Sequence, residues 1–171
     1  LNGTKGKLEK ILNRLEEKER IPSAQEVLTR IKFSTQMADF EGCGMVIEAI
    51  IEKLDIKQQV FSTLESIVGD DCILATNTSS ISITKIAAVT SRPEQVIGMH
   101  FMNPVPIMKL VEIIRGYSTS DEVTNTIMEV SKTLNKVPVE VNDYPGFVAN
   151  RILMPMINEA IITLNEGVAG V

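Results

Sequence analysis

Three short apolar runs, separated by segments with a helical period, constrain the fold of this chain more than any other feature. The runs cover residues 45–47, 72–75 and 96–99. Apolar side chains recur at helical spacing from Glu52 onward, and a short helix is expected over residues 83–89. Strands that alternate with helices in this way favour parallel strands joined by right-handed crossovers. The sequence therefore predicts an α/β fold.

Polar clusters directly follow all three runs. They are Glu48 to Glu52, Asn77 to Ser80, and His100 to Asn103. The carboxyl ends of parallel strands meet at one rim of a sheet, which is where such sheets bind ligands. Strand ends also need polar residues, and Asn, Thr and Ser are common helix caps. The positions alone therefore leave both a ligand site and simple capping open.

The third cluster holds the only histidine of the 171 residues. His100 follows an apolar strand, and two prolines then turn the chain into a second apolar run over residues 110–114. Glu112 is the only acid in that run, so it needs a partner if it is buried. A carboxylate on one ring nitrogen leaves the other free to take a proton near neutral pH. We expect His100 and Glu112 to pair, although a histidine beside an apolar run can also be purely structural.

The other segments give a coarse map of the chain. Two capping-box spacings, Ser23 with Glu26 and Thr119 with Glu122, predict helix starts. The remaining expectations are an amphipathic helix over 5–20, a plausible edge strand over 31–35, an edge strand over 137–141, a boundary turn over 142–146, and an apolar helix from Phe147 that stops near Gly167.

Composition excludes several classes of protein. The formal net charge of -5 argues against a nucleic-acid partner, which would need a basic face. No apolar run approaches the roughly 20 residues of a membrane span, so no membrane partner is expected. Cys43 and Cys72 lack metal-ligand spacing and are expected to be buried free thiols of a reducing compartment, namely cytoplasm, mitochondrial matrix or peroxisome. One histidine and two distant cysteines predict no metal site.

Four separated motifs resemble the 3-hydroxyacyl-CoA dehydrogenase family in order and spacing. They are Glu48-Ala49-Ile50-Ile51-Glu52, Asn77-Thr78-Ser79-Ser80, the block from His100 to Glu112, and Pro145-Gly146-Phe147-Val148-Ala149-Asn150-Arg151. The resemblance implies a Rossmann-like, mostly parallel sheet over residues 1–143. It implies that residues 144–171 begin an all-α C-terminal domain, which in the family supplies dimer contacts.

The resemblance also implies a reaction and roles for individual residues. The reaction is oxidation of a (3S)-3-hydroxyacyl-CoA to the 3-ketoacyl-CoA, with NAD as the cofactor. His100 matches the base and Glu112 the residue that orients it, whereas Ser79 and Asn150 match positions that hold the substrate or its reacting oxygen. The positions that surround the NAD ribose and nicotinamide are matched by Glu52, Lys57, Asn77 and Asn103.

The sequence departs from the family pattern at its start. No Gly-x-Gly-x-x-Gly turn is present, so the resemblance predicts a sheet that lacks its first βαβ unit. It also predicts that most of the helical domain is absent, and that the chain by itself binds NAD weakly and turns over slowly or not at all. The alternative is a non-catalytic module that docks on a partner chain through its sheet edge and last helix.

Overall fold

The computed structural model describes residues 2–170 and divides the chain into two units, one up to Asp39 and one from Phe40 onward. The first unit contains α1 (Asn2–Glu17) and α2 (Ala24–Thr29). The Ser23 side chain caps α2 by accepting a hydrogen bond from the Glu26 amide, as predicted. The first unit is thus a pair of helices.

The strand expected over residues 31–35 is wrong. This segment is irregular because its side chains bond locally: Lys32 Nζ donates to Asp39 Oδ1 at 2.7 Å, and the Ser34 hydroxyl donates to the same carboxylate. Two apolar residues in alternation were too few to predict a strand. The short 3₁₀ helix η1 (Met37–Phe40) follows.

One five-stranded sheet organises the second unit, in the order β1-β2-β3-β4-β5. The strands β1, β2 and β3 are parallel, β4 is antiparallel to β3, and β5 is parallel to β4. This confirms the predicted mostly parallel α/β sheet, with β5 at an edge. The strand bounds are β1 (Met45–Glu48), β2 (Ile73–Thr76), β3 (Val96–Phe101), β4 (Leu110–Arg115) and β5 (Val137–Asn142).

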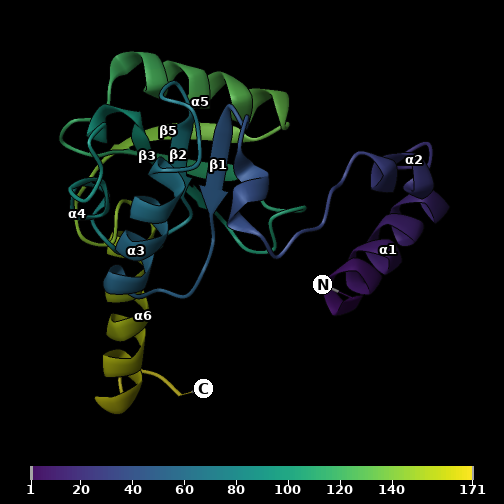
Figure 1. Cartoon of the computed structure of the whole chain (residues 1–171). Coiled ribbons are helices and arrows are strands. Elements are labelled where there is room, and N and C mark those ends of the chain that lie inside the picture. Colours follow the sequence, from purple (N-terminus) through teal and green to yellow (C-terminus); the bar gives the residue numbers. More distant parts are fainter. Residues whose placement is uncertain (1, 171) are drawn as a thin grey trace. The chain divides into compact units, whose positions relative to one another are not determined.

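Helices cover both faces of this sheet, with α5 on one face and α3 and α4 on the other (Figure 1). Their bounds are α3 (Leu54–Glu65), α4 (Ile83–Ala87) and α5 (Asp121–Thr133), and the 3₁₀ helix η2 (Pro93–Gln95) leads into β3. The α5 cap is Ser120, which accepts a hydrogen bond from the Val123 amide, and not Thr119 as predicted. Thr119 is instead buried, and its hydroxyl donates to the Val96 carbonyl at 2.6 Å.

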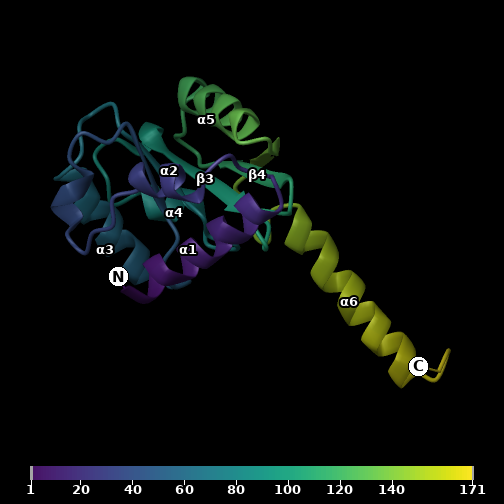
Figure 2. The ribbon, with the colours of Figure 1, turned by 90° about the vertical axis from the view of Figure 1, so that its right-hand side faces the viewer.

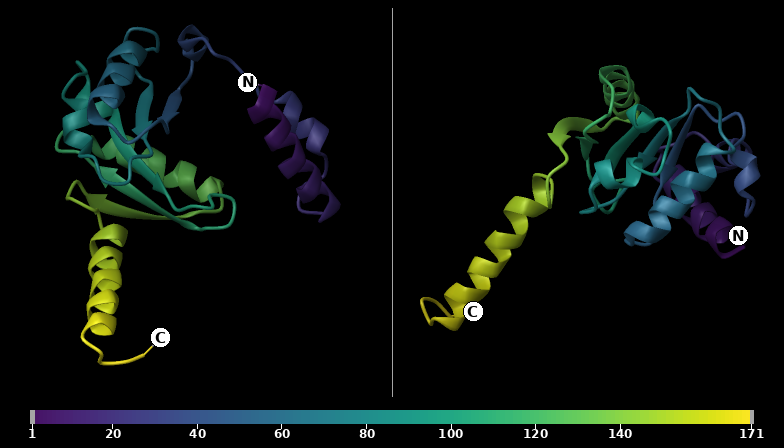
Figure 3. Two further views of the ribbon diagram at one scale, coloured as in Figure 1. Left: turned by 90° about the horizontal axis from the view of Figure 1, so that it is seen from below. Right: turned by 60° about the vertical axis from the view of Figure 1, so that its left-hand side comes forward.

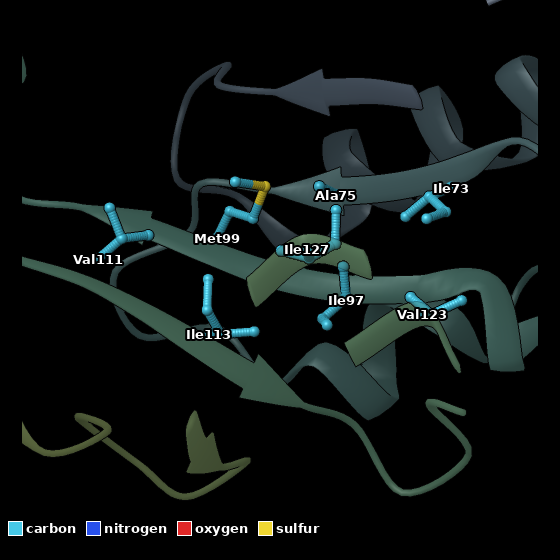
Figure 4. Packing of buried hydrophobic residues seen from close by; sticks show 8 residues of the cluster. All are labelled: Ile73, Ala75, Ile97, Met99, Val111, Ile113, Val123 and Ile127. Carbon is cyan, nitrogen blue, oxygen red and sulfur yellow. The ribbon is translucent and has the colours of Figure 1, made fainter. Parts of the chain in front are cut away.

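The core between the sheet and α5 is aliphatic (Figure 4). Burial of such side chains, at roughly 25 cal/mol per Å² of apolar area, is what holds α5 on the sheet. On the opposite face, Gly98 lets three elements approach closely, since a Cβ there would lie 2.9 Å from both Ile114 and Ile83. The core residues shown are Ile73, Ala75, Ile97, Met99, Val111, Ile113, Val123 and Ile127.

The last helix, α6 (Ala149–Asn165), extends away from the sheet (Figures 2 and 3). It begins after Phe147, although the apolar pattern predicts a helix that includes this residue. Phe147 has a φ of 49° and is buried, so it belongs to the turn between β5 and α6. Most of the apolar residues of α6 are exposed, including Ile152, Leu153, Met154, Met156, Ile157, Ile161 and Leu164.

Both cysteines are free thiols. Cys72 is buried as predicted, and burial raises the pKa of its thiol, whereas Cys43 is only partly buried, which corrects the prediction. Within residues 2–170, no helix has the length and apolar character needed to cross a membrane.

Candidate active site

His100 and Glu112 lie directly opposite each other on β3 and β4, as register partners of the antiparallel pair. His100 Nδ1 lies 2.8 Å from Glu112 Oε2. The side chains are both buried, with 6% and 2% of their residue surface exposed. The predicted contact is therefore present, and it exists because the turn after His100 folds β4 back onto β3.

The second nitrogen of this imidazole stays available. Among the described residues, His100 Nε2 has no hydrogen-bond partner, and it is not one of the fully buried unpaired atoms. Because the carboxylate accepts at Nδ1, the proton of the neutral ring belongs on Nδ1 and the lone pair on Nε2. This arrangement suits a general base that faces a ligand.

The other oxygen of Glu112 holds the start of α6. Oε1 accepts hydrogen bonds from the backbone amides of Val148 at 3.0 Å and Ala149 at 2.9 Å. Phe147 packs against the imidazole, with ring centroids 5.7 Å apart and planes inclined at 59°. One carboxylate therefore orients His100 and anchors the first turn of α6, where unpaired amides favour an anion.

Ser79 and Asn150 are brought to the same rim. The loop after β2 is tied to β3, since Asn77 Oδ1 accepts from the Phe101 amide at 2.9 Å. Asn150, in the first turn of α6, donates from Nδ2 to the Ser79 carbonyl at 3.2 Å. Ser79 is exposed and Asn150 half-buried, so both can face a ligand beside His100.

A second polar network lies beneath the ends of β1 and β2. Lys57, on α3, is fully buried, and its Nζ lies 2.8 Å and 2.9 Å from the two oxygens of Glu48 and 3.4 Å from Glu52 Oε2. Glu48 Oε2 also accepts from the Thr76 hydroxyl at 2.7 Å. Lys57 is thus buried and paired with carboxylates, and its match to the cofactor site stays a prediction.

Glu52 connects this network to the loop after β2. Its Oε1 accepts from the Thr78 hydroxyl at 2.5 Å and from the amides of Ser79 at 2.9 Å and Ser80 at 3.1 Å. Partial burial raises the pKa of the Glu52 carboxyl, but these hydrogen bonds and Lys57 outweigh burial and hold that pKa below its usual value. Asn103, the fourth residue matched to the cofactor, lies exposed in the loop that follows β3.

Sequence reasoning missed two residues that build the site. Glu48 was grouped with the polar cluster after β1, but it is buried and pairs with Lys57. Asp143 was assigned only to the boundary turn, yet its carboxylate accepts from the Ser82 hydroxyl at 2.7 Å and from the amides of Ile83 at 3.0 Å and Thr84 at 2.9 Å. The burial of Lys57 could have been predicted from the sequence, because Lys57 shares the helical face of Leu54 and Phe61.

No cluster of three or more metal-ligating side chains occurs in the part of the chain that the structure describes. What the rim offers instead is a base with a free nitrogen, hydroxyl and amide groups, and carboxylates at the ends of parallel strands. This combination defines an α/β protein of the nucleotide-binding type, with an acid–base pair at the rim of its sheet.

The chain belongs to the 3-hydroxyacyl-CoA dehydrogenase family. The model of the family's NAD binding domain matches residues 1–144, and the model of its C-terminal domain matches residues 146–171. Comparison with individual proteins supports the same family and shows how much of each relative this chain covers.

The relatives that match are longer than this chain. A probable 3-hydroxybutyryl-CoA dehydrogenase of Deinococcus radiodurans is 54% identical over 170 residues, which are 99% of this chain and 61% of the relative. The 3-hydroxybutyryl-CoA dehydrogenase of Clostridioides difficile is 53% identical over 84% of this chain and 51% of its own length. The crystal structure of (S)-3-hydroxybutyryl-CoA dehydrogenase PaaH1 from Ralstonia eutropha superposes with a TM-score of 0.91 at 50% identity, over 94% of this chain and 58% of that one.

Proposed function

We propose that the protein containing this chain oxidises a (3S)-3-hydroxyacyl-CoA to the 3-ketoacyl-CoA with NAD. The observation that carries the proposal is the buried contact between His100 Nδ1 and Glu112 Oε2, at 2.8 Å, which leaves Nε2 for the substrate. Family membership and relatives described as 3-hydroxybutyryl-CoA dehydrogenases support it. A short acyl chain would agree with those relatives.

In the proposed reaction, His100 Nε2 takes the proton of the C3 hydroxyl as the C3–H bond breaks and the keto group forms. Glu112 keeps the ring proton on Nδ1 and balances the charge of the imidazolium. In the reverse direction, the imidazolium returns that proton to the oxygen. The same pair therefore serves both directions of the reaction.

Ser79 and Asn150 are proposed to hold the reacting oxygen. A hydroxyl and an amide N–H near the base can donate to that oxygen and stabilise the charge that develops on it. Their placement is supported by the hydrogen bond from Asn150 Nδ2 to the Ser79 carbonyl, which joins them at one rim.

The residues present fit the ribose and nicotinamide half of NAD. Glu52, Asn77 and Asn103 follow the parallel strands and have exposed or partly exposed polar groups, so we propose that they line this half. Lys57 also matches this half, and its side chain is fully buried. The chain contains no glycine turn for the pyrophosphate. When bound, NAD would supply the hydride acceptor.

The test is a steady-state assay of the protein, at the length its gene encodes, with 3-hydroxybutyryl-CoA and NAD. We expect NADH production that His100→Gln abolishes without altering NAD binding in a fluorescence titration. NADH production by His100→Gln at the rate of the unsubstituted protein would contradict the proposal.

The exposed apolar residues of α6 support a second candidate, in which the chain docks on a partner as a non-catalytic module. In the dehydrogenase proposal, the same residues belong to the helical domain and its homodimer contact. Mass measurement in solution together with NAD titration separates the two. A tight complex without NAD affinity would favour the module, and a dimer that binds NAD would favour the enzyme.

A further inference from the structure

The turn between β5 and α6 is bound to the start of α4 by one side chain. Asp143 is half-buried and directly follows β5. Its Oδ1 accepts a hydrogen bond from the Ile83 amide at 3.0 Å. Its Oδ2 accepts from the Ser82 hydroxyl at 2.7 Å, and from the amide and hydroxyl of Thr84 at 2.9 Å and 2.7 Å. We call these contacts the Asp143 clamp, and the mechanism proposed above does not use it.

The start of α4 is a fixed place on the sheet. Ile83 is fully buried, and a Cβ added at Gly98 or Gly116 would lie 2.9 Å or 3.2 Å from its side chain. Interiors packed this closely do not deform freely. The Thr84 hydroxyl also accepts from the Tyr117 amide at 2.9 Å, which ties the same helix to the segment after β4. The clamp therefore holds the turn before α6 to a rigid part of the fold.

The turn that follows Asp143 is strained. Gly146 and Phe147 have φ values of 80° and 49°, and a residue with a side chain keeps such a conformation only where its surroundings enforce it. After the turn, the first amides of α6 donate to Glu112, and the Phe147 ring packs against His100. Asp143 and Glu112 thus hold the turn at its two ends.

The clamp joins the two segments that carry the residues proposed to hold the reacting oxygen. Ser79 lies in the loop after β2, residues 77–80, which we call the Ser79 loop, and Ser82 lies just after it. Asn150 lies in the first turn of α6, and its Nδ2 donates to the Ser79 carbonyl at 3.2 Å. Ser79 is also held from another side, because its amide donates to Glu52. What the clamp fixes is therefore the segment of Asn150 relative to Ser79.

We propose that Asp143 is a positioning residue for Asn150, and that it acts through the turn between β5 and α6. This inference rests on the proposed function and deepens it. A group displaced by about 1 Å can lose most of its effect on a reaction, so the donor on α6 needs a fixed turn before it. Asp143 supplies the fixed point, and no contact between Asp143 and the substrate is proposed.

Steady-state kinetics compare Asp143→Ala with the control Asp71→Ala. Asp71 is an exposed aspartate in the turn before β2, and the proposed mechanism uses no residue of that turn. We expect Asp143→Ala to lower kcat by roughly tenfold or more, with KM for NAD within about twofold, because the residues that line the NAD half are not part of the clamp. Asp71→Ala should change neither constant. A raised KM for NAD with unchanged kcat would overturn the proposal.

A double-mutant cycle tests whether Asp143 acts through Asn150. Asn150→Ala should lower kcat by itself. Adding Asp143→Ala should then lower kcat little further, because the group that the clamp positions is already gone. Effects that multiply in full would mean that the two residues act separately, and the proposal would then be wrong.

Amide hydrogen exchange, read by NMR on the 171-residue chain, tests the clamp without any assay of activity. The amides of Val148 and Ala149 are protected by their bonds to Glu112. In Asp143→Ala they should exchange roughly tenfold faster or more, while the amides of β3 stay protected. Unchanged exchange at Val148 and Ala149 would overturn the clamp.

A second variant keeps the proposal testable if Asp143→Ala does not fold. Asp143→Asn keeps the size of the side chain, but in either orientation its NH2 group faces a backbone N–H, that of Ile83 or that of Thr84. It should fold and still show faster exchange at Val148 and Ala149, and rates equal to those of the unsubstituted chain would refute the proposal. A protein without dehydrogenase activity would refute the proposed function, whereas the exchange rates would still decide the clamp.

Discussion

Two buried acid–base pairs lie on the same sheet, and they differ in which atoms are left without a partner. In the pair of Lys57 with Glu48, at β1 and α3, the ammonium is enclosed by three carboxylate oxygens within 3.4 Å. In the pair of His100 with Glu112, at β3 and β4, one ring nitrogen is bound at 2.8 Å and the other has no partner among the described residues.

We call Lys57 with Glu48 the closed pair and His100 with Glu112 the open pair. The contacts of the closed pair stabilise the fold, whereas the open pair has an atom available for a ligand. A charged group with its donors paired stabilises one arrangement of the chain. An imidazole with one nitrogen fixed and one free can exchange a proton with a bound molecule. Burial and a charged partner alone therefore do not distinguish the two pairs, and the proposal for His100 depends on its unpaired ring nitrogen.

Replacing the open pair should have the largest effect. His100→Ala should lower kcat by about 10²–10⁴-fold, the usual contribution of a positioned proton acceptor. His100→Gln should be as inactive, because an amide cannot take the proton, but more stable, because it can still donate to Glu112. Steady-state kinetics and urea unfolding give these values.

Breaking the closed pair should act first on stability. Lys57→Met leaves Glu48 buried without its partner and should lower the free energy of unfolding by about 3–5 kcal/mol. The double variant with Glu48→Gln should regain most of this loss. Chemical denaturation measures the three variants, and equal stability of the single variant and the unsubstituted chain would show that the pair is not buried as described.

Glu52 should give the chain a dependence on pH that its replacement removes. Its folded pKa lies below the usual value of a glutamate, so its contribution to stability is fully present above that usual pKa and is lost as the pH falls through the folded pKa. Unfolding midpoints of the unsubstituted chain and Glu52→Gln should therefore differ at neutral pH and converge as the pH falls through the folded pKa of Glu52. Parallel curves would contradict the bonding of Glu52 to the Ser79 loop.

The smallest effect is expected away from both pairs. Ser120→Ala removes the cap of α5, whose hydroxyl accepts from the Val123 amide at 3.1 Å, and should cost about 1 kcal/mol of stability. Since α5 covers the face opposite α4, kcat should not change. A large loss of kcat would show that ordinary destabilisation mimics the effects expected at His100.

The sequence predicted the open pair better than the closed one. Glu112 was recognisable because it stands alone among aliphatic residues, and His100 because no other histidine competes with it. Lys57 and Glu48 were harder, since both lie in segments with many charges. Only the helical register of Lys57 with Leu54 and Phe61 marks it as buried.

Contacts between distant segments could not be predicted from local patterns. The bonds from Asp143 to the start of α4 and from Glu112 to the first amides of α6 join residues 36 to 61 positions apart. The cap of α5 was misplaced by one residue because Thr119 and Ser120 are both good caps, and only the bond from Thr119 to Val96 decides between them. The division of domains at 143/144 stays a prediction.

The most direct test of the open pair is the protonation of its imidazole, and the single histidine makes the signal unambiguous. Long-range ¹H–¹⁵N spectra of the chain, at a pH where the ring is neutral, should show the proton on Nδ1 and a lone pair on Nε2. Replacement of Glu112 by Gln should weaken this preference. A neutral ring with its proton on Nε2 would contradict the account, because the lone pair of His100 would then be on Nδ1, which faces Glu112 and not a substrate.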